Sequence, residues 1–315
     1  MLNLKNQTIT DISSNEELIS IIVLTYNHAD FIAENMRGIL MQQVHAEVEL
    51  IISDDGSTDQ TVQIIQHELT NAPANFKIKF FKQPKNLGAT PNFYFALEQV
   101  TGNFVTFCEG DDYWTDPFKL QTQLDFMQQH PDCSLCFHTA VNISDDPKIH
   151  RTDFSEVEDR AYSTLEIYWR WIIHTATVMM RTDVLQSKAK KATMTRDDLQ
   201  YFDTVLFMAA STVGKLYGIS KRMSAYRRHD AGLSAGSVNY KRDLRHNQLD
   251  KIIGDFYGGE IKKTADWLIF SRSRINFGKL LFQRKLKLML QYSRWLVLTK
   301  GNLKVYLIKK YFTSH

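Results

Sequence analysis

The sequence predicts an α/β protein with a mostly parallel central sheet and helices on both of its faces. Through the first half of the chain, short β-rich apolar runs alternate with amphipathic stretches, an order typical of strands joined through helices. The chain has 315 residues, 43% of them hydrophobic, which suffices for one large domain with an appendage. No run approaches the roughly 18 apolar residues of a membrane span. We therefore expect a folded globular protein.

Each expected element follows from its local pattern. The expected strands are residues 18–27, 48–53, 76–81, 102–109, 134–141 and 174–181. The expected helices are residues 30–43, 58–69, 90–100, 117–129, 163–173 and a segment including 201–211, and the chain from Tyr240 onward is expected to be helical. Ser57, Thr58 or Asp59 is the expected cap of the second helix, and Asp116 with Pro117 is expected to open the fourth.

Acidic pairs follow two of the expected strands. Asp54 and Asp55 come at the end of the second strand, and "EGDD", from Glu109 to Asp112, follows the fourth. Adjacent carboxylates repel each other unless a cation or strong donors neutralise them. Either pair alone has the simpler interpretation of an acidic turn. Together with "TYNH" after the first strand, however, three polar loops converge on the edge where parallel sheets bind ligands.

In this combination the loops resemble those of the inverting nucleotide-sugar glycosyltransferases of family 2, which have the GT-A fold. The resemblance rests on "SIIVLTYNHADFIAENMRGILMQQ", "ELIISDDGSTDQT", "KNLGATPNF" and "GNFVTFCEGDDYWTDPFKLQTQLDFM", and it covers about residues 19–235. It implies that a sugar moves, with inversion, from a nucleotide diphosphate donor to an acceptor hydroxyl. A UDP-sugar is the preferred donor, and the acceptor would be a glycan, a lipid-linked molecule or a protein in surface polysaccharide, lipopolysaccharide or glycoprotein synthesis.

The resemblance also implies a division of the chain. Residues 1–18 are a polar N-terminal lead, and residues 19–239 are the GT-A catalytic domain. Within that domain, residues 19–130 form the nucleotide-binding half and residues 131–239 the acceptor half. Residues 240–315 form a basic helical C-terminal extension.

The donor site that the resemblance implies comes from the strand-end loops and from the later segment "SAYRRHDAGLS". Asp55 is expected to read the base, Asp54 to support its loop, and Trp114 either to line the sugar site or to plug the core. The residues expected to contact the donor are Thr25, Tyr26, Asn27, Asp54, Asp55, Lys85, Asn86, Gly88, Asp111, Trp114, Arg227 and Arg228.

The "EGDD" acids match the metal motif of the family. Asp112 is the expected direct ligand of Mn²⁺ or Mg²⁺, and Asp111 is expected to contact the ribose or to bind the metal through water. His229 is a further candidate ligand, and His174 is expected to line the acceptor cleft.

An inverting transfer also needs a general base on the attacking side of the sugar. In the family this is an acid that opens a downstream helix. The stretch "TRDDLQYFDTVLFMAASTVGKLYGI" offers Asp197, Asp198 and Asp203. The spacing back from "GKL" favours Asp203, and Asp198 is the alternative.

The C-terminal part of the chain is strongly basic. Residues 241–315 contain 17 Lys/Arg against 5 Asp/Glu, a balance of +12, and no acid follows Asp266. Residues 279–298 predict one amphipathic helix, with Arg284, Lys287, Gln291 and Arg294 on one stripe and Phe282, Leu286, Met289 and Leu296 opposite. This helix would pack on the catalytic domain or a second protomer, or residues 267–315 would lie on an anionic membrane surface.

The expected location is the cytoplasm, either free or at the inner face of the cell membrane. The N-terminus is polar and lacks the order of a signal peptide, and the three cysteines cannot all pair with one another. The "CSLC" stretch at 133–136 is expected to contribute core cysteines rather than a zinc or redox site.

Two alternative functions remain open. One is a non-catalytic nucleotide-sugar-binding assembly subunit, which the intact acids disfavour. The other is a nucleotidyltransferase on a related fold, which would be expected to carry a glycine-rich loop with Lys or Arg after the first strand. The missing G-x-G-x-x-G disfavours a dehydrogenase, and no nucleic-acid-binding module is recognisable.

Overall fold

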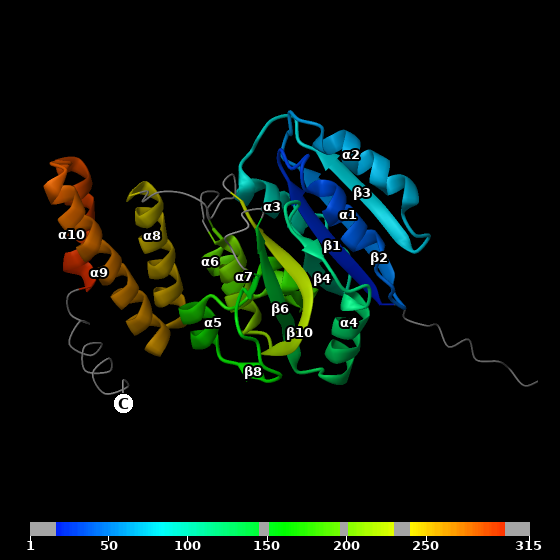
Figure 1. The fold of residues 1–315 in the computed structure, drawn as a ribbon. Coiled ribbons are helices and arrows are strands. Elements are labelled where there is room, and N and C mark those ends of the chain that lie inside the picture. Colours follow the sequence, from blue (N-terminus) through cyan, green and yellow to red (C-terminus); the bar gives the residue numbers. More distant parts are fainter. Residues whose placement is uncertain (1–16, 145–150, 196–200, 230–239, 300–315) are drawn as a thin grey trace, which may run out of the picture.

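The computed structural model describes residues 17–144, 151–195, 201–229 and 240–299. The strands are β1 (Leu18–Thr25), β2 (Glu47–Asp54), β3 (Phe76–Lys82), β4 (Phe104–Phe107), β5 (Tyr113–Trp114), β6 (Cys133–Ser144), β7 (Thr152–Asp153), β8 (Ala161–Tyr162), β9 (Met179–Arg181) and β10 (Lys215–Arg228). They form one mixed sheet in the order β3-β2-β1-β4-β9-β6-β10-β5, with β7 beside β6 and β8 beside β10 (Figure 1).

Most of the long strands run in the same direction. β1 pairs in parallel with β2 and β4, β2 with β3, and β6 with β10. The short strand β9 is antiparallel to both β4 and β6, so β6 and β10 have the direction of β4. The carboxyl ends of these six strands therefore lie along one edge of the sheet, which is the edge where ligands bind in α/β proteins.

Helices cover both faces of this sheet. The helices of the sheet-containing part are α1 (Ile32–Leu40), α2 (Thr61–Glu68), α3 (Ala89–Glu98), α4 (Lys119–Gln129), α5 (Thr164–Arg170), α6 (Lys188–Thr193) and α7 (Phe202–Ala210). Short 3-10 turns, η1 (Leu69–Asn71), η2 (Thr175–Thr177) and η3 (Thr182–Gln186), connect some of them.

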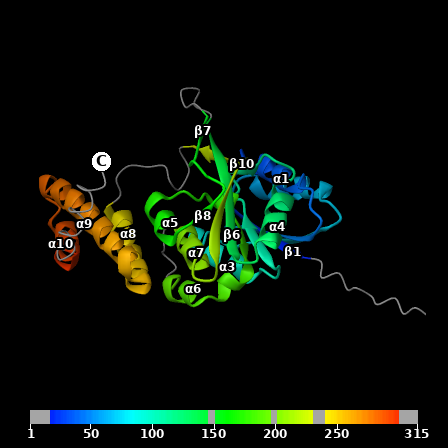
Figure 2. The same ribbon diagram turned by 90° about the horizontal axis from the view of Figure 1, so that it is seen from below.

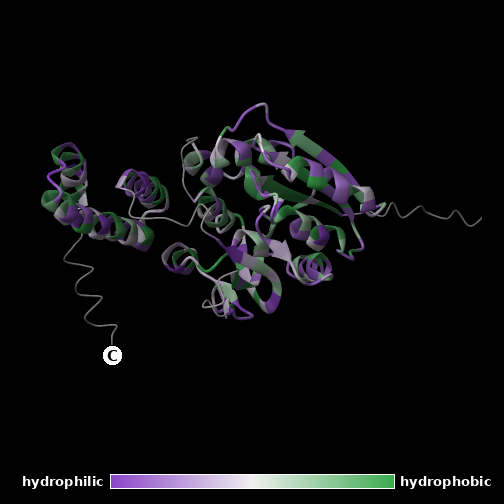
Figure 3. Ribbon diagram, turned by 45° about the horizontal axis from the view of Figure 1, so that its top comes forward, coloured by the Kyte–Doolittle hydropathy of each residue, from purple (hydrophilic) through white to green (hydrophobic). Residues whose placement is uncertain are grey.

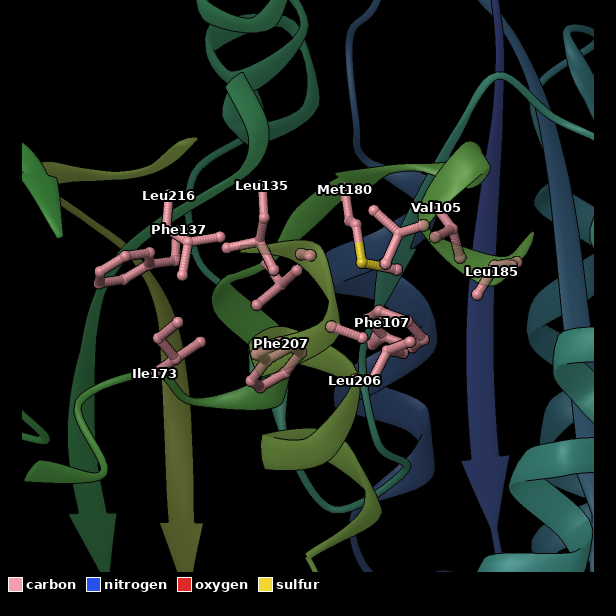
Figure 4. Packing of buried hydrophobic residues seen from close by; sticks show 14 of the residues in the cluster. Val105, Phe107, Leu135, Phe137, Ile173, Met180, Leu185, Leu206, Phe207 and Leu216 are labelled. Atoms are coloured by element: carbon pink, nitrogen blue, oxygen red, sulfur yellow. The ribbon is translucent and has the colours of Figure 1, made fainter. Parts of the chain in front are cut away.

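The core forms two apolar layers, one on each face of the sheet. Ile21 and Val23 of β1 pack with residues of α1, α2 and α4, whereas Ile22 packs on the other side with residues of α3 and α7. This alternation follows from the two-residue period of a strand. Figure 4 shows the second layer, where Phe107 and Phe207 pack beside residues of β6 and β9.

Two helix starts differ from the predicted ones. α2 begins at Thr61, and of the three expected caps only Asp59 bonds to its first residue, since the side chain of Asp59 accepts the N–H of Thr61 at 3.0 Å. α4 begins at Lys119, since Asp116 instead forms a turn in which its side chain accepts the N–H of Phe118 at 2.8 Å. Both differences arise because Asp and Ser stabilise turns as readily as helix ends.

The predicted strand at 174–181 is shorter than expected. His174 and the following residues form η2, in which Nδ1 of His174 accepts the N–H of Ala176 at 3.3 Å, and only Met179–Arg181 is strand. The β-branched threonines of this segment suit a strand, but tertiary contacts decide its conformation.

The prediction of core cysteines is confirmed. Cys108, Cys133 and Cys136 are all buried with free thiols, and all three lie in the apolar layer beneath α1 and α4. Burial raises the pKa of the Cys133 thiol to about 12, which disfavours the thiolate that metal binding and redox chemistry require.

Three further helices, α8 (Tyr240–Tyr257), α9 (Gly259–Phe282) and α10 (Leu286–Thr299), lie to one side of the sheet beside α5 and α6 (Figures 1 and 2). The expectation of one continuous amphipathic helix at 279–298 is wrong. The chain turns between α9 and α10, where Arg284 has a φ of +54°. No helix in the described part of the chain combines the length and the apolar character needed to cross a bilayer.

A buried polar network joins these helices to the sheet-containing part. The hydroxyl of Tyr168 on α5 donates to Asp250 on α8 at 2.7 Å, and Arg272 on α9 donates to the other oxygen of Asp250 at 2.9 Å. Apolar side chains surround this network, including Val205 and Met208 of α7. The helix α7 is therefore packed on one side by the C-terminal helices.

Candidate active site

The loops after β1 and β2 are held together by hydrogen bonds. The backbone N–H of Asn27 donates to Oγ of Ser57 at 2.9 Å, and the side chain of Asn27 accepts the N–H of Thr58 at 2.8 Å. Asn27 has a φ of +54°, a conformation that Asn tolerates better than most residues. Thr25 is buried at the end of β1, whereas the ring of Tyr26 is 40% exposed.

The two acids after β2 have different partners. Asp54 is buried and accepts hydrogen bonds from the N–H and the hydroxyl of Ser57. Asp55 is 3% exposed and accepts the N–H groups of Leu87 and Gly88 at 2.7 and 3.0 Å. Asp54 therefore shapes its own loop, and Asp55 ties that loop to the one after β3.

The loop after β3 presents polar side chains to solvent. Lys85 and Asn86 are exposed, and Gly88 has a φ of +96° that favours glycine. A Cβ on Gly56 would lie 2.8 Å from the backbone of Lys85, so the loops after β2 and β3 pack closely only because residue 56 is glycine.

Asn35 on α1 holds the loop after β4 in place. This side chain is fully buried, and its amide donates to the carbonyls of Glu109 and Asp112, each at 2.8 Å. Gly110 allows a second close approach, because a Cβ there would lie 2.6 Å from Nδ1 of His28. Asn35 was not singled out from the sequence, since nothing local marks a helical Asn as a loop anchor.

The three acids of this loop form a cluster. Glu109, Asp111 and Asp112 each offer a carboxylate oxygen, and these oxygens lie within 4.8 Å of one another. Nε2 of His229, the residue after β10, lies 3.1 Å from Oδ2 of Asp111. Although burial raises it, the His229 contact and the nearby His28 hold the pKa of Asp111 below its ordinary value.

Asp112 is the most buried acid of the cluster. Its side chain is 2% exposed, Oδ1 accepts the N–H of Arg227 at 2.9 Å, and Oδ2 lies 3.5 Å from Nε2 of His174. Burial, followed by the charges of Asp111 and Glu109, raises its pKa well above the ordinary value. Burial also lowers the pKa of His174 to about 4, so this pair is a contact of a neutral imidazole rather than an ion pair.

The two arginines of the "YRRH" segment differ in exposure. The guanidinium of Arg227 pairs with Glu34 of α1 and donates to the carbonyl of Asp111 at 3.2 Å. It also lies over the ring of Phe31, 5.0 Å from the ring centroid. Arg227 thus clamps β10 onto the acidic loop, and Arg228 is exposed to solvent.

The acidic cluster fits a divalent cation. Carboxylate oxygens with one imidazole nitrogen are a donor set that Mn²⁺ accepts, and carboxylates alone suit Mg²⁺. Burial and the charges of Asp111 and Asp203 raise the pKa of Glu109 to about 8. Holding these carboxylates together in their charged form costs free energy, and a bound cation would offset that cost. The cluster therefore suits the divalent metal that the sequence implies.

Asp203 lies in the first turn of α7 and faces the same site. It accepts a hydrogen bond from the side chain of Thr175, and its charge acts on Glu109. Burial raises its pKa despite these hydrogen bonds. The alternative base, Asp198, lies outside the described residues.

Trp114 is a core residue rather than a wall of the sugar site. Its side chain is 1% exposed, and Nε1 donates to the carbonyl of Ala176 at 3.0 Å. The ammonium of the fully buried Lys119 lies 3.9 Å from the centre of its ring. Of the two interpretations that the sequence left open, the structure supports the buried plug.

Aromatic side chains next to the site were not predicted as a group. The ring centroid of Phe154 lies 5.1 Å from that of His174 and 5.5 Å from those of Trp171 and Tyr226. Trp171 is 45% exposed, and its ring packs edge-on against that of Tyr201 with the two centroids 5.9 Å apart. Their positions in the sequence are far apart, so only the fold brings them together.

Comparison with known proteins gives the chain a family. Residues 20–187 match the model described as Glycosyl transferase family 2. An uncharacterised protein of Mycobacterium tuberculosis is 30% identical over 220 residues, which are 68% of this chain and 60% of that protein. The chain thus spans only about 60% of the length of these relatives. The putative teichuronic acid biosynthesis glycosyltransferase TuaG of Bacillus subtilis is 28% identical over 215 residues, 67% of this chain and 79% of that protein.

A solved structure shares the fold. S. aureus TarS 1–349 in complex with UDP-GlcNAc has a TM-score of 0.63 and 21% identity, over 90% of this chain and 80% of that chain. The predicted GT-A type of α/β fold is therefore confirmed. The match to the family model ends before α7, so Asp203 and His229 lie beyond it.

Proposed function

The chain belongs to glycosyl transferase family 2, and we propose that it transfers a sugar from a nucleotide diphosphate donor to an acceptor hydroxyl in polysaccharide synthesis. One observation carries this proposal: three strand-end loops, an acidic cluster and Asp203 meet at one edge of the sheet. A UDP-sugar is the proposed donor, because TarS was solved with UDP-GlcNAc on the same fold. TuaG, named for teichuronic acid biosynthesis, supports a polysaccharide acceptor.

The nucleotide would lie against the loops after β1, β2 and β3. The exposed ring of Tyr26 is available for stacking on the base. Asp55 already accepts two backbone N–H groups, and each of its oxygens keeps a second lone pair for a base N–H. Lys85 and Asn86 are exposed for contact with ribose or phosphate, and Arg228 is an exposed cation at the end of β10.

For the metal, we propose Asp111 rather than Asp112 as the principal ligand. Asp111 is 20% exposed and lies beside His229, whereas Asp112 is 2% exposed and has one oxygen on the backbone of Arg227. Glu109 and His229 would complete the set of protein ligands, and Asp112 would hold β10 in place. A bound Mn²⁺ or Mg²⁺ supplies positive charge against the leaving diphosphate.

Asp203 is the proposed general base. Because burial raises its pKa, its carboxylate is a stronger base than an exposed Asp. It would take the proton of the acceptor hydroxyl as the oxygen attacks the anomeric carbon and the sugar-phosphate bond breaks. Attack from the side opposite the leaving group inverts the anomeric centre.

The acceptor would lie on the aromatic side of the site. Trp171 is 45% exposed and contacts Tyr201, which precedes Asp203 by two residues in the chain. Exposed aromatic rings beside a polar site are common in carbohydrate and small-molecule pockets. A glycan acceptor is therefore the class that this surface fits best.

The test is a panel of nucleotide sugars with Mn²⁺ or Mg²⁺, in which release of the nucleoside diphosphate is measured with and without glycan acceptors. We expect Asp203→Asn to lower kcat by about 10²- to 10⁴-fold while leaving nucleotide affinity unchanged. Asp111→Asn should weaken metal-dependent nucleotide binding as well. Asp183→Asn, which changes an exposed acid in the first turn of η3, is the matched control and should leave both unchanged.

Three outcomes would overturn parts of the proposal. Nucleotide binding without turnover, for any donor, would favour the non-catalytic subunit. Pyrophosphate as the product would favour a nucleotidyltransferase. Normal turnover by Asp203→Asn would exclude Asp203 as the base.

A further inference from the structure

Exposed apolar side chains gather on α9, on α10 and in the turn between them. We define the corner surface as the exposed apolar side chains of α9, α10 and the turn between them: Ile275, Leu281, Phe282, Leu286, Leu290, Val297 and Leu298. Phe282 is 95% exposed, Val297 76% and Leu286 70%. In Figure 3 hydrophobic and hydrophilic residues lie side by side along these two helices.

The clustering sets this surface apart from ordinary exposed apolar residues. Seven of the sixteen large hydrophobic side chains exposed in the described part of the chain fall within residues 275–298. Single exposed apolar residues are normal, whereas clusters mark interaction sites. On α10, Leu286, Leu290 and Val297 are spaced at i, i+4 and i+11, which places them on one face of the helix.

The corner surface is not needed to hold α10 in place. The buried hydroxyl of Tyr292 donates to the carbonyl of Tyr240 at 2.7 Å and accepts a hydrogen bond from Asn276 at 3.1 Å. Asn276 also donates to Asp243 of α8 at 2.7 Å. These bonds fix the other side of α10 to α8 and α9. The exposed leucines are therefore free for a partner.

The charge around the corner surface selects the partner. Residues 267–299 contain seven Lys/Arg and no Asp/Glu. Arg284, Lys285 and Lys287 are exposed in the same turn as Phe282 and Leu286. A second copy of this chain would bring one basic surface against another, and like charges oppose that contact. An anionic lipid surface attracts the cations and accepts the apolar side chains at the same time.

We propose that the turn between α9 and α10 inserts its apolar side chains into the surface of an anionic lipid bilayer. The protein would then be held at the membrane by one face of a helical pair. This differs from the stripe expected from sequence, since Met289 and Leu296 are partly buried and the inserting residues are those at the turn.

The experiment is co-sedimentation of the full chain with vesicles of phosphatidylcholine alone or of phosphatidylcholine mixed with phosphatidylglycerol. We expect binding to the anionic vesicles only, and we expect added salt to weaken it. Phe282→Ser combined with Leu286→Ser should weaken binding by at least about tenfold, because both side chains lose their apolar contact with lipid. Phe118→Ser removes a side chain that is 52% exposed on another part of the molecule, and it should bind like the parent.

A second variant tests the electrostatic part separately. Lys285→Glu combined with Lys287→Glu should abolish the preference for anionic vesicles. Both residues are exposed, and Lys285 loses only a contact of 5.6 Å with the ring of Tyr240, so the thermal unfolding transition should shift little. Absence of binding to either vesicle would overturn the proposal. So would a dimer in sedimentation velocity that Phe282→Ser with Leu286→Ser abolishes. The measurement needs no turnover, so its outcome is independent of the proposed transfer reaction.

Discussion

Replacing Lys119 by Met should stabilise the protein. The ammonium of Lys119 is fully buried, donates to the hydroxyl of Thr106 at 2.6 Å and lies over the ring of Trp114. No carboxylate pairs with it among the ion pairs of the described residues. Burial lowers its pKa from 10.5 to about 7. A methionine side chain has a similar length and carries no charge, so it removes the cost of burial and keeps most of the packing.

The size of the effect follows from the two pKa values. At about 1.4 kcal/mol per pH unit, the charged form of Lys119 costs about 5 kcal/mol more in the folded chain than in the unfolded chain. The substitution loses one hydrogen bond and one cation-π contact, together worth about 2 kcal/mol. Below pH 7, Lys119→Met should therefore raise the free energy of unfolding by about 3 kcal/mol.

The pH dependence has a definite sign. Between about pH 7 and 10.5 the unfolded chain binds a proton on Lys119 that the folded chain does not, so wild-type stability rises with pH in this window. The Lys119→Met variant has no titrating group at this position and lacks that rise. Its advantage over wild type should therefore shrink by about 2 kcal/mol between pH 7 and pH 9.

The assay is urea unfolding of both proteins at several values from pH 6 to 9, followed by fluorescence. The difference between the two unfolding free energies isolates Lys119 from the other titrating groups. Lys221→Met replaces an exposed lysine on β10 and should show no such pH-dependent difference. A gap between Lys119→Met and wild type that stays constant over this range would refute the reasoning.

Three further changes test the loops and the core. Trp114→Phe should lower the free energy of unfolding by about 1–3 kcal/mol without changing nucleotide affinity, and a selective loss of affinity would contradict its burial. Gly110→Ala should impair nucleotide binding, because the new Cβ would clash with His28. As a control, Gly278→Ala places its Cβ in open space on α9 and should stabilise the protein by about 1 kcal/mol in thermal unfolding. Asn35→Ala should leave two loop carbonyls without their donor and lower both stability and kcat; unchanged kcat would exclude a role in positioning the acidic loop.

The order of the longer strands and helices through residue 141 could be predicted because it is encoded locally. The long strand β10, in contrast, was not among the expected strands. β1 and β2 each contain a run of consecutive apolar residues and are buried over most of their length, as expected for strands covered on both faces. The convergence of their loops then follows from the geometry of parallel strands. The same reasoning put Asp54, Asp55 and the acidic loop at one edge.

The features that could not be predicted depend on contacts distant in sequence. Trp114 is buried because β5 pairs with Ser224 and Ala225 of β10 and packs against Gly38. β10 also covers Asp112, because the backbone N–H of Arg227 on this strand donates to the Asp112 side chain. The apolar residues on either side of the break between α9 and α10 keep nearly the spacing of one continuous helix. Hydrophobicity alone therefore does not reveal the break.

The packing of α7 against the C-terminal helices sets a limit on how this protein could be recombined with its relatives. Val205 and Met208, which follow Asp203 on the same helix, are covered by Leu249, Ile253 and other side chains of α8 and α9. A chimera joined at residue 240 would place side chains of another protein against α7. It would also replace Asp250, the hydrogen-bond acceptor of the Tyr168 hydroxyl. A working exchange would have to include α5 and α7 together with α8–α10, so the natural module boundary lies within the second half of the sheet-containing part rather than after it.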